Sequence, residues 1–285
     1  MNCTNAANRE YSPDCGAIWN ILIEESQNRG TGMQKSSRIV AAFTLSVQLL
    51  LPLGNGAQAA ELRVLAGSAL AEPLKKLAPQ FETLSGHQLV FSYGATPDLI
   101  KLATSGAPFD LGVCPEDVLK NASAAAQFAG PATRIAHAGL AVAVRAGASK
   151  PDIGTPAALK QTLLDAQSIV TIPASATGTQ LLQVFDVLGI SEAMRPKLRA
   201  QTTPAQIAEA VTRGEGELAV FLINVLMASG LDVVGPFPPE LQRNVVFTAA
   251  VAANTQKAEI ARAFITHLTS PAAIAVLKAS GMEPD

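Results

Sequence analysis

Hydroxyl-bearing residues stand at the junctions where several predicted strands pass into helices. Ser68 lies in the stretch LAGS, between an apolar segment and an amphipathic one, and Thr96, Thr177 and Thr203 occupy similar places further along the chain. The first N–H groups of a helix have no partners within it, and together with the helix dipole they attract anions. Small residues keep such a site open. The same residue types are also common helix caps, so the junctions alone predict either an anion site or simple caps.

Residues typical of catalytic and metal sites do not form a recognisable set. His87, His137 and His267 are scattered without HxxxH or HExxH spacing, and residues 60–285 contain no GxSxG, SxxK or Walker A sequence. Cys114 follows an apolar segment and has no identifiable histidine partner, which favours a buried structural thiol over a nucleophile. The sequence therefore predicts a protein that is not an enzyme and that holds no metal or other cofactor.

Composition limits the class of partner. The 285 residues are 48% hydrophobic, and 21 Lys and Arg against 23 Asp and Glu give a net charge of −2. A chain of this length can bury one large core or two modest ones. Lys and Arg do not cluster with aromatic residues, so a nucleic acid partner is not expected.

The segment 33–59, MQKSSRIVAAFTLSVQLLLPLGNGAQA, has the three parts of a secretory signal peptide. Two positive residues precede an apolar run over 39–53, and AQA over 57–59 fits a cleavage site. The run is shorter than a bilayer span requires, which disfavours a transmembrane anchor. We therefore expect the protein to be exported, most simply to a bacterial periplasm.

Residues 1–32 precede a positive segment that normally begins the chain, so we interpret them as an unstructured upstream extension. Cys3 and Cys15 lie in this extension, and only Cys114 lies beyond it. The exported protein is thus expected to contain no internal disulfide.

From residue 61 on, short apolar segments alternate with longer amphipathic ones, which is typical of an α/β fold. The predicted strands cover 62–65, 88–93, 111–113, 138–144, 168–172, 217–223, 233–234 and 245–251. The predicted helices cover 69–84, 97–105, 115–128, 156–163, 178–188, 191–198, 204–213, 223–229, 256–268 and 271–280.

Hydroxyl residues followed by proline predict several helix starts. Thr96, Thr155, Thr203 and Ser270 each precede a proline, and Thr177 and Thr203 each have a glutamine three residues later, as in a capping box. Thr155 lies in a surface loop where nothing suggests a ligand. We therefore expect Thr155 only to cap its helix, and we compare the candidate site residues with it.

Five stretches occur in an order that resembles the molybdate-binding proteins of ABC importers, which are type II periplasmic solute-binding proteins. They are VLAGSALAEPLKKLAPQFE, YGATPDLIKLATSGAPFDLGVCPED, IPASATGTQLLQVFDVLGI, GELAVFLINVLMASGLDVVGPFP and ARAFITHLTSPAAIAVLKASGMEP. The resemblance covers residues 60–285. Its most specific piece is the SGAPFD loop over 105–110, while the C-terminal stretch marks the broader class.

The resemblance implies an α/β fold of two lobes with a ligand cleft between them. Placing the two chain crossings by the family pattern gives lobe one as 60–138 plus 246–285 and lobe two as 139–245. A cleft between lobes is also where ligands bind most often.

In molybdate-binding proteins, neutral hydroxyls and backbone N–H groups hold the oxyanion, and no cation balances its charge. By resemblance the corresponding ligand-binding residues are Ser68, Thr96, Thr177 through its backbone, and Thr203. A family tyrosine that donates to the oxyanion corresponds to Phe221, which has no donor. Thr96 also departs from the serine-rich run of the family.

The implied function is capture of a small oxyanion, molybdate or tungstate, by a monomer that delivers it to an ABC permease in the inner membrane. Two alternatives stay open at the level of sequence. The departures at Phe221 and Thr96 allow a different small anion or an organic acid. The same two-lobed clamp would also suit a periplasmic sensor module.

Overall fold

The computed structural model describes residues 59–285, which fall within one compact unit. The predicted upstream extension and all but the last residue of the predicted signal peptide lie outside the described residues.

Ten strands form one mixed sheet. Along its main path the strands follow the order β2-β1-β3-β9-β4-β7-β5-β6, and β8 and β10 each pair with β4. Their bounds are β1 Glu61–Gly67, β2 Gln88–Gly94, β3 Leu111–Pro115, β4 Phe128–Val144, β5 Ile169–Thr171, β6 Leu198–Ala200, β7 Leu218–Leu222, β8 Asp232–Pro236, β9 Asn244–Ala252 and β10 Glu283–Pro284.

Helices fill the connections and cover the sheet. They are η1 Ser68–Leu70, α1 Ala71–Ser85, α2 Thr96–Thr104, α3 Glu116–Lys120, α4 Ala122–Ala125, α5 Pro156–Asp165, α6 Ala176–Leu188, α7 Ser191–Met194, η2 Arg195–Lys197, α8 Pro204–Thr212, α9 Ile223–Met227, α10 Ala258–Leu268 and α11 Pro271–Ala279. Among residues 59–285, no single helix is long and apolar enough to cross a membrane. The pair α10 and α11, bent by 59° at the break between them, has the length and apolar composition of a membrane span when the two are taken together.

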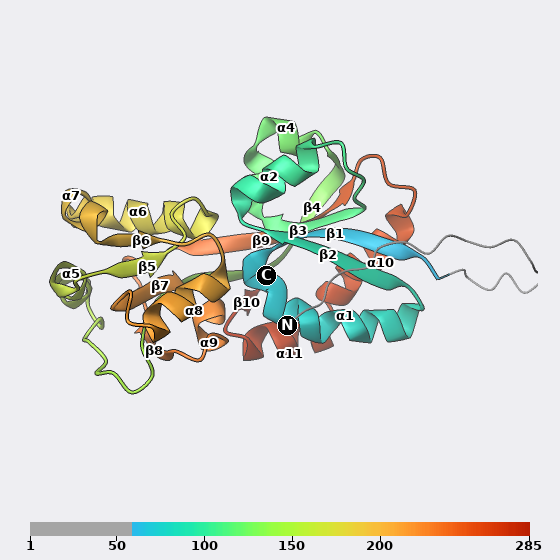
Figure 1. Cartoon of the computed structure of the whole chain (residues 1–285). Coiled ribbons are helices and arrows are strands. Elements are labelled where there is room, and N and C mark those ends of the chain that lie inside the picture. Colours follow the sequence, from blue (N-terminus) through green and yellow to red (C-terminus); the bar gives the residue numbers. More distant parts are fainter. Residues whose placement is uncertain (1–58) are drawn as a thin grey trace, which may run out of the picture. The chain divides into compact units, whose positions relative to one another are not determined.

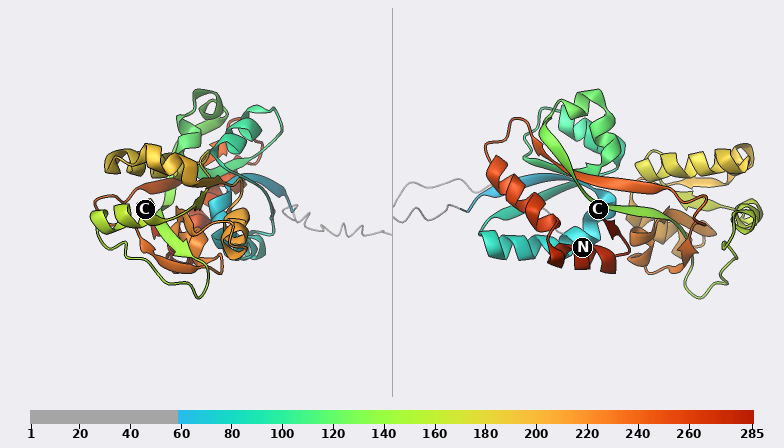
Figure 2. Two further views of the ribbon diagram at one scale, coloured as in Figure 1. Left: turned by 60° about the vertical axis from the view of Figure 1, so that its left-hand side comes forward. Right: turned by 180° about the vertical axis from the view of Figure 1, so that it is seen from behind.

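The sheet divides into two lobes that β4 and the segment leading into β9 connect (Figures 1 and 2). The first lobe contains β1–β3, β9, β10, α1–α4, α10 and α11; the second contains β5–β8 and α5–α9. The first part of β4 pairs with β9, and its last part pairs with β7 and β8. The predicted two-lobed α/β fold is confirmed, whereas the residue boundaries of the lobes stay a prediction.

Parallel pairing within each lobe directs strand ends toward the cleft. β1 lies parallel to β2 and β3, and β5 lies parallel to β6 and β7. The carboxyl ends of parallel strands share one edge of a sheet, and the helices that follow begin there. In each lobe the helix starts are therefore gathered at one edge.

All eight predicted strands are present, but the single helix predicted over 115–128 is broken at Asn121 into two short helices and ends three residues early. The short helices α3 and α4 end at Ala125, and β4 begins at Phe128. The sequence FAGPATRIAHAG over 128–139 is poor in β-branched residues, so its propensity gave no strand signal. Long-range pairing with β9, interrupted by register shifts, makes it a strand.

Buried Asp110, the last residue of the SGAPFD loop, ties three segments of the first lobe together. Its carboxylate accepts hydrogen bonds from the Arg63 backbone N–H (2.8 Å), the Thr255 hydroxyl (2.6 Å) and the Lys257 ammonium (3.1 Å). Burial alone would raise the pKa of Asp110, but these donors outweigh it and hold the pKa below its ordinary value. The loop thus fixes β1 and β3 relative to the start of α10.

The substitution Asp110→Asn should lower the free energy of unfolding by about 2 kcal/mol at pH 7, because hydrogen bonds to a charged group are lost. A lowered folded-state pKa stabilises the protein above the unfolded pKa of about 4 and ceases to do so as the pH falls through the folded pKa. Urea unfolding from pH 7 to pH 2 should therefore show the difference from wild type shrinking below about pH 4. Exposed Glu215, which pairs with Arg213, supplies the control, since Glu215→Gln should leave the urea midpoint unchanged. A difference that does not vary with pH would contradict this role of the carboxylate.

Candidate functional site

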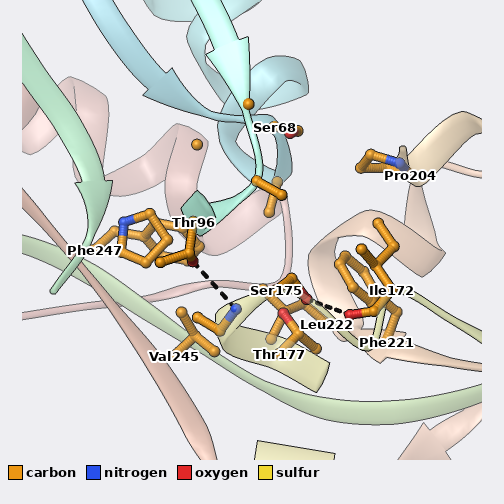
Figure 3. Close-up of a pocket in the computed structure, with 16 residues that line it drawn as sticks. Ser68, Thr96, Ile172, Ser175, Thr177, Pro204, Phe221, Leu222, Val245 and Phe247 are labelled. Carbon is orange, nitrogen blue, oxygen red and sulfur yellow. Dashed lines mark hydrogen bonds between the residues drawn. The ribbon is translucent and has the colours of Figure 1, made fainter. Parts of the chain in front are cut away.

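A pocket with a cavity volume of about 30 Å³ lies between the lobes where strands end and helices begin (Figure 3). We call it the inner pocket. Its lining residues are Gly67, Ser68, Ala69, Gly94, Ala95, Thr96, Pro115, Ile172, Ser175, Ala176, Thr177, Pro204, Phe221, Leu222, Val245 and Phe247. No residue of this lining carries a charge, so its polar character comes from hydroxyls and backbone groups.

The helix starts of both lobes meet at this pocket. Ser68 opens the turn from β1 into α1, Thr96 begins α2, Ser175 precedes α6, and Pro204 begins α8. Each start carries N–H groups without partners inside its own helix. Their dipoles point positive ends at one small volume, which is an arrangement suited to an anion.

The Ala66-Gly67-Ser68 junction is small because two neighbours approach its backbone. A Cβ atom at Gly67 would lie 3.2 Å from Cδ of Pro115 and 3.3 Å from Cε1 of Phe247. Glycine therefore lets the turn pack against the pocket wall, and half-buried Ser68 faces the space beyond it.

Thr96 links the lobes instead of capping its helix. The structure corrects the predicted cap, because α2 begins at Thr96 and Ala95 is the capping residue. The Asp98 carboxylate accepts a hydrogen bond from the Ala95 N–H (3.2 Å). The Thr96 hydroxyl does not cap α2 and instead accepts a hydrogen bond from the Ala176 N–H across the cleft (3.2 Å; Figure 3).

The start of α6 also differs from its prediction. Ser175, not Thr177, is the cap: its hydroxyl accepts a hydrogen bond from the Gly178 N–H (3.0 Å) and donates one to the Ile172 carbonyl (2.7 Å). Thr177 lies in the first turn and is 3% exposed. A Cβ atom at Gly178 would lie 2.3 Å from the Ile172 carbonyl oxygen, so only glycine lets the helix start so close to the preceding loop.

Apolar side chains close the other sides of the pocket. Phe221, 3% exposed at the end of β7, faces the same space as Ile172, Val245 and Phe247 (Figure 3). The aromatic ring of Phe221 supplies a wall and no hydrogen bond. Any polar recognition must therefore come from the helix starts.

Thr203 is the one predicted site residue that does not line the inner pocket. It caps α8 with the expected capping box, in which its hydroxyl accepts from the Gln206 N–H and the Gln206 side chain accepts from the Thr203 N–H. Thr203 lines an adjoining space of about 470 Å³, which we call the outer chamber. The two spaces share Ser68, Ala69, Gly94, Ala95 and Pro204.

The outer chamber, in contrast to the inner pocket, carries charge. Glu72 and Lys75 pair with each other on α1, and Asp98 lies at the start of α2. Burial, with a smaller contribution from Glu72, raises the pKa of Tyr93 to about 12, so its hydroxyl stays neutral and able to donate. Charged groups therefore surround the approach to the inner pocket but not its interior.

Sequence reasoning brought Ser68, Thr96, Thr177 and Phe221 to one pocket, but it missed Ser175 and Phe247. Ser175 could have been found, because it precedes Gly178 by three residues in a run of three candidate caps. Phe247 gave no signal of its own, since it lies inside an ordinary apolar strand. As ligand contacts, the five predicted residues stay predictions.

A family model described as bacterial extracellular solute-binding protein matches residues 62–283. An aconitate isomerase from a Pseudomonas species is 31% identical over 255 residues, which cover 85% of this chain and 96% of that protein. The molybdate-binding protein ModA of Azotobacter vinelandii is 28% identical over 250 residues, or 84% and 98% of the two chains. The solved structure of the A. vinelandii periplasmic molybdate-binding protein superimposes with a TM-score of 0.62 at 21% identity, covering 78% of this chain and 98% of that one.

The substitution Gly178→Ala should lower the free energy of unfolding by about 2 kcal/mol, because the added methyl group overlaps backbone atoms that cannot rotate away. Chemical denaturation measures this loss. Gly154→Ala, in an exposed loop where the nearest atom would be 3.3 Å away, is the control and should cost less than about 0.5 kcal/mol. Equal losses for the two variants would show that the α6 start is not tightly packed.

Proposed function

Because the chain belongs to the family of bacterial extracellular solute-binding proteins, we propose that it captures a small oxyanion, molybdate or tungstate, and delivers it to an ABC importer. One observation carries this proposal: helix starts and hydroxyls from both lobes line an inner pocket without a charged side chain. The curated relative named as molybdate-binding, similar over most of both chains, supports the choice of ion.

The proposed binding mode uses hydrogen bonds in place of opposite charge. In this mode the hydroxyls of Ser68 and Thr96 donate hydrogen bonds to the anion from the first lobe, and the N–H groups of Ala176 and Thr177 donate hydrogen bonds to it from the second. The Ala176 N–H now donates to the Thr96 hydroxyl; a bound oxygen would take over that donor and would also accept a hydrogen bond from the Thr96 hydroxyl, whose own hydrogen is independent of the lone pair that now accepts. Hydrogen bonds to a charged acceptor are about twice as strong as neutral ones, which replaces the hydration that the ion gives up. Thr203 would act from the outer chamber.

The proposal extends to the protein's place in the cell. A monomer would be exported to the periplasm after removal of the signal peptide over 33–59, bind its anion there and dock on an inner-membrane permease. The same clamp would serve a periplasmic sensor, and a neighbouring gene for a sensor kinase in place of a permease and an ATPase would favour that role.

A second candidate ligand is an organic acid. Phe221 has no hydrogen-bond donor to offer a tetrahedral oxyanion. In addition, a relative that is 31% identical to this chain is named an aconitate isomerase. Isomerisation of aconitate moves a proton and so needs a group that removes one. The inner pocket is lined by no carboxylate, imidazole, amine or thiol, and we propose binding without catalysis there; the carboxylates of Glu72 and Asp98 line only the adjoining outer chamber. Cys114 lies next to lining residue Pro115, but burial raises the pKa of its thiol to about 12.

Thermal unfolding in the presence of molybdate, tungstate, sulfate, phosphate, citrate and both aconitate isomers tests the proposal. A ligand at 100 times its dissociation constant adds about 2.7 kcal/mol, which raises the midpoint of a domain this size by about 5–10 °C. We expect molybdate and tungstate to do so. A shift with the carboxylic acids alone would establish the second candidate instead. NMR of cis-aconitate incubated with the protein should show no trans isomer, and its appearance would contradict the non-catalytic assignment.

The substitution Phe221→Tyr should tighten molybdate binding by up to about tenfold, because it adds one hydroxyl donor to the wall of the inner pocket. Isothermal titration calorimetry measures the change. Phe109→Tyr, a half-buried phenylalanine in the first lobe that packs on Phe128, is the matched control and should leave the affinity unchanged. If neither variant alters binding of an anion that wild type binds, Phe221 does not contact that anion.

A further inference from the structure

Away from the strands that connect the lobes, two hydrogen bonds join the lobes within residues 59–285. Each salt bridge of these residues joins two partners of the same lobe. One of the two hydrogen bonds is the bond from Ala176 to Thr96 inside the inner pocket. The other runs from the side-chain amide of Asn224 to the Ala69 carbonyl oxygen, at 2.7 Å between residues 155 positions apart. An anion in the inner pocket would displace the first bond. The second lies in the outer chamber, beyond the inner pocket, and would survive.

The bond from Asn224 joins two elements that carry proposed site residues. Asn224 is the second residue of α9, which follows β7 directly and so begins just after Phe221. Ala69 is the middle residue of the turn that Ser68 opens. The bond therefore connects the start of α9, just after Phe221 in the second lobe, to the turn η1 that contains Ser68 in the first lobe.

A second contact holds α9 against the first lobe. A Cβ atom at Gly281, in the turn between α11 and β10, would lie 2.6 Å from Sδ of Met227 and 3.6 Å from Cα of Asn224. The C-terminal turn thus packs directly on α9. The backbone of Asn224 therefore packs against the turn at Gly281, while its side-chain amide donates to the Ala69 carbonyl.

The side chain of Asn224 is arranged for this bond and not for filling space. It is 4% exposed, and its Oδ1 atom is buried with no hydrogen-bond partner. The Ala69 carbonyl can only accept, so the amide group that faces it must be the NH₂ end. An unpaired buried oxygen costs free energy that an apolar side chain of similar size would avoid. The amide is therefore explained by the hydrogen bond that its NH₂ group donates across the cleft to the Ala69 carbonyl.

We propose that Asn224 is a positioning residue that sets the spacing between the Ser68 turn and the Phe221 wall, and thereby selects anions by size. The inference rests on the proposed function, because it assumes that an oxyanion sits between these two elements. A pocket that recognises an ion by hydrogen bonds of fixed length discriminates only if its walls hold their separation. Without the tie, the turn that presents Ser68 would move relative to the second lobe.

Calorimetry with molybdate and sulfate as probes tests the proposal in Asn224→Ala and Asn224→Asp. The alanine variant removes the donor, and we expect about three- to tenfold weaker molybdate binding and an affinity ratio between the two anions that moves toward one. The aspartate variant places a carboxylate oxygen against the Ala69 carbonyl and should weaken binding further. Asn121→Ala is the control: Asn121 caps α4 by accepting from the Ala124 N–H (3.1 Å), so its loss should destabilise the first lobe without changing the ratio.

Hydrogen exchange of the full chain without added anion gives a readout that does not depend on the ligand. In Asn224→Ala the amides over 68–74 should exchange faster than in wild type, while those of the β4 core stay unchanged. Unchanged exchange over 68–74, or faster exchange throughout the chain, would overturn the proposal, as would an affinity ratio that stays constant. If wild type binds neither anion, the oxyanion function fails, and the exchange comparison still decides whether Asn224 ties the lobes.

Discussion

The N–H groups that open a helix need partners, and the inner pocket is built around that requirement. The parallel strands of each lobe end at one edge and place four helix starts around a small buried volume. Buried N–H groups without partners are costly, so hydroxyls complete the starts: Ser175 accepts from Gly178, and Thr96 accepts from Ala176. Gly67 and Gly178 let the chain pack closely at these junctions, because a Cβ atom at either position would meet neighbouring atoms of the pocket wall or of the preceding loop.

The inner pocket is lined by no charged side chain, although charged groups lie elsewhere in the first lobe and around the outer chamber. The buried carboxylate of Asp110 and its partner Lys257 stabilise the first lobe by joining its segments to one another, and Glu72, Lys75 and Asp98 lie around the outer chamber. An anion bound in the proposed site would therefore meet directed hydrogen bonds and no opposite charge. Its recognition would depend on distances between donors, so the contacts that hold the lobes at a fixed spacing would belong to the proposed binding site.

Local sequence patterns predicted most elements of the fold, because strands such as β7 carry continuous apolar runs and the first half of β1 alternates exposed and buried residues. These patterns gave wrong predictions where contacts between distant residues determine the secondary structure or the helix cap. The first half of β4 is a strand only through β9, and the α6 cap is Ser175 because Gly178 can approach Ile172. For the site, small junction residues and the family resemblance pointed to Ser68 and Thr96. No local pattern could relate Asn224 to Ala69, since the bond depends on how two lobes meet.

A crystal structure with the anion that most stabilises the protein tests the central claim most directly. We expect anion oxygens within about 2.7–3.2 Å of the Ser68 hydroxyl and the Ala176 N–H, with the bond from Ala176 to Thr96 replaced. We also expect that no lysine or arginine contacts the anion. An anion bound to charged side chains elsewhere, with the Thr96 bond intact, would contradict the proposed binding mode.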